Sequence, residues 1–89
     1  MEFEWDPAKS EATFRARGFD FAYASRVLSG NQLEAIDARL NYDEVRIKAI
    51  GPVGADLLVV IYTVRGFRYR IISARRANRK ERAKWLSRV

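Results

Sequence analysis

Residues 44–76 read EVRIKAIGPVGADLLVVIYTVRGFRYRIISARR, three apolar-rich runs separated by glycine-containing turns. In Glu44–Ile50 apolar and charged residues alternate, which indicates a strand with one face on the core. Ala55–Val64 is rich in β-branched residues and favours a central strand covered on both faces. Arg65-Gly66 is then a two-residue hairpin loop, and Phe67–Arg75 is the returning strand. This stretch predicts an antiparallel sheet.

Capping signals predict helices on both sides of this sheet. Asp6 is an N-cap residue followed by proline, and Gly18 can end a helix, so a helix is expected between them. Asp20 is a second N-cap residue, and apolar residues recur after it at helical spacing. Near the C-terminus, Asn78 and Glu81 form a capping-box pair that opens a basic helix.

Weaker patterns complete the predicted fold. Met1–Trp5 alternates and suits a short edge strand, Leu33–Arg39 is the weakest strand pattern, and residues 41–43 are a turn. No repeat or linker interrupts the chain, so one domain over 1–89 is expected. The predicted fold class is α+β, with two N-terminal helices packed on an antiparallel β-sheet and followed by a short C-terminal helix.

The composition restricts the chemistry that the chain can perform. It contains no cysteine and no histidine, which excludes disulfides, Cys/His zinc sites, thiol nucleophiles and imidazole catalysis. We expect no metal and no cofactor. The absence of cysteine fits a reducing compartment such as the cytoplasm. The longest apolar run, Leu57–Tyr62, is too short to span a membrane, and no secretory leader is visible.

The charge is unevenly divided along the chain. Residues 1–44 carry five basic and nine acidic side chains, whereas residues 45–89 carry twelve basic and two acidic ones. The second half would repel itself unless a polyanion or an acidic partner meets it, and nucleic acid is the first candidate. The alternative is a solvated basic surface.

The loops decide which side chains share a face of the sheet. With loops at Gly51–Gly54 and Arg65-Gly66, cross-strand partners can be assigned, and partners share a face. One face then collects Glu44, Arg46, Lys48, Thr63, Arg68 and Arg70. The other face, predicted to be the core, collects Val45, Ile47, Leu58, Val60, Tyr62, Tyr69 and Ile71.

Four cations on one sheet face favour an anionic ligand such as the phosphates of RNA. The alternative is an ordinary solvated face, with arginine stems lying over an apolar floor. For Glu44 the alternative is a salt bridge to Arg46, Arg68 or Arg70. Trp85 either packs its helix onto the sheet or stacks on a base.

The chain resembles the BrnT family of bacterial toxins, within the broader RelE-like ribonuclease group, over essentially its whole length. The matching stretches are Phe3-Glu4-Trp5-Asp6-Pro7 with Lys9, Asp37-x-Arg39 with Tyr42, Glu44 and Arg46, Leu58–Thr63 followed by Arg65-Gly66, and Arg70–Ala77 followed by Glu81-Arg82. The resemblance implies a small ribonuclease that inhibits translation and acts on RNA, in some relatives on the ribosome. It also implies a cognate ribbon-helix-helix antitoxin, which neutralises the toxin and brings it to operator DNA, where the complex represses its own operon.

The ribonuclease activity that the resemblance implies suggests a role for each candidate residue. RNA supplies its own 2′-OH nucleophile, so positioning and electrostatic stabilisation can carry much of the catalysis. The predicted catalytic residues are the phosphate-binding Arg46, Arg70 and Arg75, Lys48 beside the leaving oxygen, and Glu44 as the carboxylate. The predicted RNA-binding residues are Arg68, Arg76 and Trp85.

The sequence departs from the usual family pattern at three positions, which lie in two segments. Where the family usually has Lys-His before the glycine that follows the first helix, this chain has Ala16 and Arg17. Where the C-terminal helix usually carries tyrosine, this chain has Trp85. The alternative function is therefore a weakened or inactive member that binds an antitoxin or nucleic acid. A third possible function is that of a structural partner whose basic half binds an acidic protein.

Overall fold

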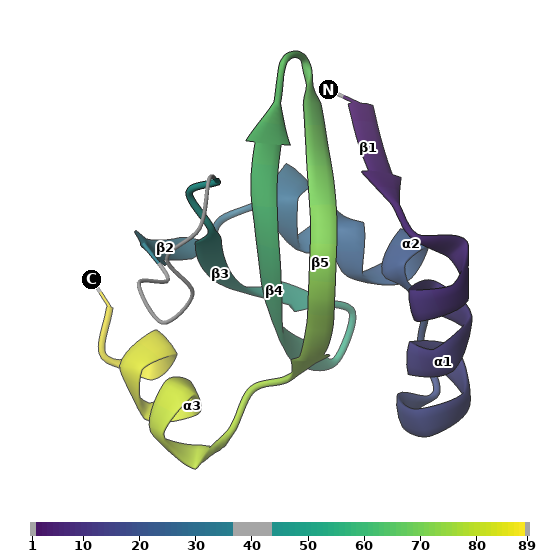
Figure 1. Ribbon diagram of the computed structural model, residues 1–89. Helices are drawn as coiled ribbons and strands as arrows, with labels where there is room; N and C mark the ends of the chain where they lie inside the picture. The colour runs from purple at the N-terminus through teal and green to yellow at the C-terminus, as the bar shows by residue number, and fades with distance from the viewer. Residues whose placement is uncertain (1, 37–43, 89) are drawn as a thin grey trace.

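The computed structural model describes residues 2–36 and 44–88, and its centre is a five-stranded sheet with strand order β1-β5-β4-β3-β2 (Figure 1). The strands are β1 (Glu2–Trp5), β2 (Leu33–Ile36), β3 (Ile47–Val53), β4 (Asp56–Arg65) and β5 (Arg68–Arg76). The helices are α1 (Pro7–Arg17), α2 (Phe21–Ala24), the 3-10 helix η1 (Ser25–Ser29) and α3 (Arg79–Leu86). The α+β class is confirmed. The expected turn at 41–43 lies outside the described residues.

The sheet is mixed, whereas the sequence pattern predicts an antiparallel sheet. β1 precedes the helices and pairs in parallel with β5, so Glu2 lies opposite Arg68 and Glu4 opposite Arg70. The other neighbouring pairs are antiparallel. Hairpin patterns reveal strands that are adjacent in sequence, whereas this pairing joins the two ends of the fold.

The helix boundaries agree with the capping signals. The Asp6 side chain accepts a hydrogen bond from the backbone N–H of Ala8, and Gly18 ends α1 in the left-handed region with φ of 83°. Asp20 caps α2 through the N–H of Tyr23. The capping box of Asn78 at the start of α3 is complete. No helix within 2–36 or 44–88 has the length and hydrophobicity required to cross a membrane.

Helices cover both faces of the sheet. The core face packs against α1, α2 and η1, around the buried side chains of Phe21, Leu58 and Val60. The opposite face, here called the cationic face, has its own apolar cluster beneath α3, which includes Val59 and Trp85. Figure 1 shows α3 apart from the other helices, beside the open end of the β4–β5 hairpin.

Both predicted strand registers are wrong, yet most residues lie on their predicted faces. The observed loops are Gly54-Ala55 and Gly66-Phe67. Relative to the prediction, they shift the cross-strand partners by four residues between β3 and β4 and by two residues between β4 and β5. Even shifts preserve the faces, because side chains alternate along a strand. An irregularity between Ile61 and Tyr62 then adds one residue on β5 and keeps Ile71 and Ala74 on the core face. Val45, predicted in the core, precedes β3 and is 61% exposed.

Tyr62 belongs to the core, as expected. Its ring is buried and stacks on Tyr69, with ring centroids 5.0 Å apart. Its hydroxyl donates a 2.8 Å hydrogen bond to Glu34. Burial, and then this bond, raise the pKa of Tyr62, so the hydroxyl stays protonated as a donor.

Gly51 of β3 allows a close approach that a Cβ atom would crowd. A Cβ atom there would lie 3.0 Å from the backbone oxygen of Asn31 and 3.0 Å from Val27. We expect Gly51→Ala to lower the free energy of unfolding by about 1–3 kcal/mol in urea denaturation. Gly30→Ala is the matched control, because its Cβ would meet nothing within 4 Å. Equal unfolding midpoints for the two variants would contradict this packing.

Candidate nucleic-acid interface

The cationic face gathers four of the predicted site residues, which come from two strands, β3 and β5. Lys48 lies opposite Ile61, Arg70 opposite Thr63, Arg75 opposite Val59 and Arg68 opposite Arg65. These four partners alternate along β4 and therefore point to one side of the sheet. The four cations spread over roughly 20 Å along β4, at about 3.4 Å per residue. They form two groups, one beneath α3 and one near the β4–β5 turn.

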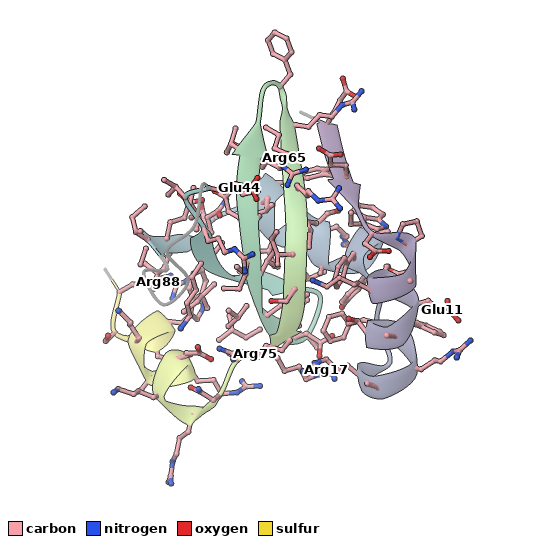
Figure 2. The ribbon with its side chains drawn as sticks, in the orientation of Figure 1. Glu11, Arg17, Glu44, Arg65, Arg75 and Arg88 are labelled. Atoms are coloured by element: carbon pink, nitrogen blue, oxygen red, sulfur yellow. The ribbon has the colours of Figure 1, made fainter. Side chains whose placement is uncertain are left out.

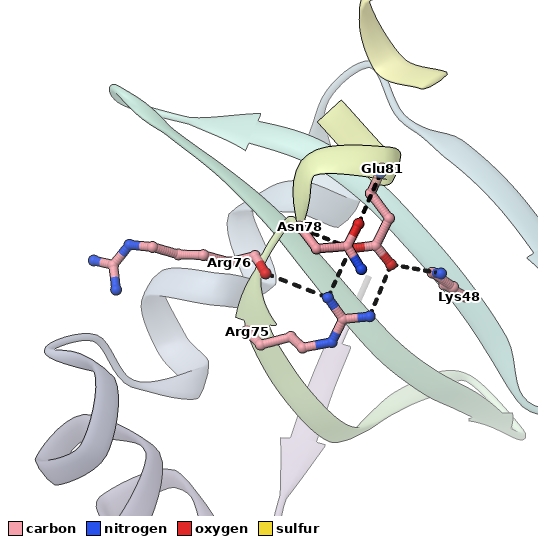
Figure 3. Close-up of polar contacts among 5 residues, drawn as sticks. All are labelled: Lys48, Arg75, Arg76, Asn78 and Glu81. Atoms are coloured by element: carbon pink, nitrogen blue, oxygen red, sulfur yellow. Dashed lines mark hydrogen bonds and ion pairs between the residues drawn. The ribbon is translucent and has the colours of Figure 1, made fainter. Parts of the chain in front are cut away.

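Glu81 organises the group beneath α3. Arg75 binds its two carboxylate oxygens at 2.7 and 2.8 Å, and Lys48 approaches at 2.6 Å (Figure 3). The backbone N–H of Asn78 donates to the same carboxylate. The Arg75 guanidinium, with Lys48 and Asn78, holds the pKa of Glu81 well below its usual range despite burial. Glu81 is therefore a fixed negative charge that positions two cations.

A groove opens beside this group, between α3 and the β2–β3 edge of the sheet. It has a volume of about 350 Å³. We call it the α3 groove, and its lining residues are Leu33, Glu34, Ala35, Lys48, Ile50, Asn78, Lys80, Glu81 and Lys84. Lys80 and Lys84 are exposed, and neither forms an ion pair with another described residue. The groove combines an apolar floor with a cationic rim.

The group near the turn is organised by Glu44. Arg65 grips Glu44 with two hydrogen bonds of 2.7 and 3.1 Å, and the two side chains meet in Figure 2. The bonded guanidinium lowers the pKa of Glu44, and the charges of Arg46 and Arg70 add to this. Glu44 thus forms a salt bridge, as one alternative predicted, but its partner is Arg65. A carboxylate held in this way is a weak base.

β1 supplies further acidic partners to this end of the face. Glu4 lies 3.4 Å from Arg70, and Glu2 lies 3.5 Å from Arg68. The second pair is largely exposed, and exposed ion pairs stabilise a fold by about 0–1 kcal/mol. A phosphate can therefore compete for Arg68. The acidic first half of the chain compensates part of the basic second half.

Two predicted RNA-binding residues do not offer their side chains to a ligand on the cationic face, because one lies on the core side and the other is buried beneath α3. Arg76 lies over the ring of Phe19 and donates to Asp56 and to the carbonyl of Arg17, on the side of the core face. It follows Arg75 in β5 and therefore points the opposite way. Trp85 is 8% exposed and packs in the cluster beneath α3, with the Arg88 guanidinium 3.3 Å from its ring centre. The packing alternative for Trp85 is correct.

A family model described as the ribonuclease toxin BrnT of type II toxin–antitoxin systems matches residues 5–81. The chain belongs to the BrnT family. No curated protein sequence matches the chain. The matched region contains the four cations of the cationic face, together with Glu44 and Glu81.

Two residues of the candidate interface in this BrnT-family chain were not predicted from the sequence. Glu81 was recognised only as a helix cap, although an acidic residue inside a basic segment is a signal of an internal ion pair. The sequence pattern places Arg65 in a loop, because the predicted turn lies one residue before the observed turn at Gly66-Phe67. Among the described residues, no cluster of three or more metal-ligating side chains exists.

Proposed function

We propose that this BrnT-family chain cleaves RNA on its cationic face and thereby inhibits translation in the cytoplasm. The observation that carries the proposal is the alignment of Lys48, Arg68, Arg70 and Arg75 on one side of the sheet. Guanidinium groups bind phosphate through two parallel hydrogen bonds and stay charged. A row of such groups suits the backbone of single-stranded RNA.

The reaction in this proposal uses the nucleophile of the RNA itself. The 2′ hydroxyl loses its proton to water as its oxygen attacks the adjacent phosphorus. The bond from phosphorus to the 5′ oxygen breaks, that oxygen takes a proton from water, and a 2′,3′-cyclic phosphate forms. Arg70 and Arg75 hold the phosphate in line, while Lys48 offsets the charge that develops on the 5′ oxygen. Glu44 and Glu81 are bound by arginines and act mainly by positioning. Turnover in isolation is therefore modest, and a ribosome can supply additional orientation of the RNA.

The cognate antitoxin has a ribbon-helix-helix DNA-binding domain in this proposal, and the complex represses its own operon. To neutralise the toxin, it places acidic and apolar side chains over the cationic face. The exposed cations of α3, which are Arg79, Lys80, Arg82 and Lys84, favour an acidic partner. A complex whose partner contacts only residues 1–44 would contradict this steric block.

A second candidate function is a non-catalytic module that binds an antitoxin or nucleic acid. It is favoured by the ion pairs that hold Lys48, Arg70 and Arg75 and by the family departures at Arg17 and Trp85. Salt dependence separates RNA binding from the docking of an acidic protein alone. For RNA, the logarithm of the binding constant falls with a slope of about −0.7 per phosphate contact against the logarithm of salt concentration.

The test of cleavage uses purified chain and RNA, with and without ribosomes. We expect discrete fragments ending in cyclic phosphate, and roughly tenfold slower cleavage by Arg70→Ala, because one phosphate contact is lost. The side chain of Arg70 is about 29% exposed, so its loss leaves the core intact. Expression in a bacterium should stop growth, and the antitoxin should restore it. Intact RNA under both conditions would favour the non-catalytic module.

A further inference from the structure

The floor and rim of the α3 groove have the character of a binding pocket. Leu33 and Ile50 form part of the apolar cluster beneath α3, and they line the groove together with Ala35. The volume of about 350 Å³ lies within the usual range for ligand pockets. A flat heterocycle can lie on this floor while its substituents reach the lysines at the rim.

The side chains of Lys48, Asn78, Lys80 and Lys84 offer hydrogen-bond donors to the groove. Both oxygens of Glu81 already accept hydrogen bonds or ion pairs from Arg75, Lys48 and the N–H of Asn78. The side-chain oxygen of Asn78 accepts from the backbone N–H of Glu81, which leaves its amide NH₂ as a donor. The Glu34 carboxylate accepts from Tyr62 on the core face.

Lysines surround these donors and add positive charge. Lys48 enters from β3, and Lys80 and Lys84 enter from α3. A ligand for this groove therefore needs a flat apolar body, adjacent hydrogen-bond acceptors and a linked anion. Among the bases, guanine presents two adjacent acceptors, O6 and N7, on one edge, and lysine is a frequent partner of that edge.

We propose that the α3 groove is a base-binding subsite that selects guanine in single-stranded RNA. The subsite deepens the proposed ribonuclease function and rests on it. The guanine ring lies on Leu33, Ala35 and Ile50, and its O6 and N7 accept from Lys48 or the Asn78 amide. The adjoining phosphates meet Lys80 and Lys84. The groove lies next to the Lys48–Glu81–Arg75 group, so a bound guanine fixes which phosphodiester reaches the cations.

The test measures binding of single nucleotides to the full chain by NMR. Guanosine monophosphate is compared with adenosine, cytidine and uridine monophosphates and with inorganic phosphate. We expect guanosine monophosphate to shift the amide signals of groove residues and to bind roughly tenfold more tightly than the other nucleotides, the effect of one good base-edge contact. Equal binding of the four nucleotides would overturn the subsite. It would also be overturned if guanosine monophosphate shifted only the signals that inorganic phosphate shifts.

Two variants locate the selectivity in the groove. Ala35→Phe fills the groove from an exposed position on β2, and Ala12→Phe on α1 is its matched control. Asn78→Asp keeps an effective helix cap but replaces the amide donor with a carboxylate that repels O6 and N7. We expect both groove variants to lose the preference for guanine, and the control to keep it. Retained preference in both would overturn the proposal.

Failure of the subsite is distinguishable from failure of the ribonuclease function. Cleavage without preference for guanine near the cut overturns the subsite and leaves the ribonuclease intact. Selective binding of guanosine monophosphate without cleavage of any RNA supports the subsite and overturns the catalytic function.

Discussion

Replacing Glu81 with alanine should destabilise the protein more than any other change to its charged residues. The variant leaves Lys48 and Arg75 without their shared carboxylate and removes half of the capping box of α3. Removing one partner of a buried ion pair together with a helix cap lowers the free energy of unfolding by about 2–4 kcal/mol. We expect a value towards the lower end of this range, because both cations are partly exposed. Urea denaturation measures the loss, and Glu11→Ala, an exposed pair on α1, should cost little.

The same residue gives a pH dependence with a defined sign. Glu81 has a lowered pKa in the folded protein, so its stabilisation is complete above its unfolded pKa of about 4.3 and is lost as pH falls below that value. We expect the unfolding free energy of Glu81→Gln to depend less on pH between about 5 and 3 than that of the wild type. Identical pH slopes would show that the carboxylate is not held by Arg75 and Lys48 in solution.

The second large effect concerns catalysis. Lys48→Ala should slow RNA cleavage by roughly 100-fold, because it removes the charge that stabilises the leaving oxygen. Arg75 still binds Glu81 in this variant, so the fold should survive. Lys9→Ala, at an exposed position on α1, is the matched control and should cleave normally. Normal cleavage by Lys48→Ala, with an unchanged unfolding midpoint, would exclude this face as the catalytic site.

Much of the fold could be predicted, because helix caps are local signals and because side chains alternate between the two faces of a strand. Neither kind of signal depends on the exact pairing of the strands. Helix caps at Asp6, Asp20 and Asn78 depend only on neighbouring residues, and each was confirmed. The face assignment survived because both register errors were even. A one-residue error would have reversed it, and the irregularity between Ile61 and Tyr62 could not be read from the sequence.

The candidate site was less predictable, because its partners come from distant parts of the chain. That Arg70 meets Glu4 depends on the parallel pairing of β1 with β5, for which the sequence has no local signal. Trp85 was ambiguous for a similar reason, since a basic helix pattern does not reveal which face of a sheet it covers. The structure resolves this by placing Trp85 in the second apolar cluster.

The pairing of β1 with β5 also constrains the order of folding. Glu4 and Arg70 are 66 positions apart in sequence, so the first strand cannot dock until β5 has been synthesised. Closing so long a loop is slow, and a chain released early would leave its first acidic residues without their arginines. During synthesis, the edge of the sheet that balances the charge of the cationic face is therefore among the last parts to be assembled.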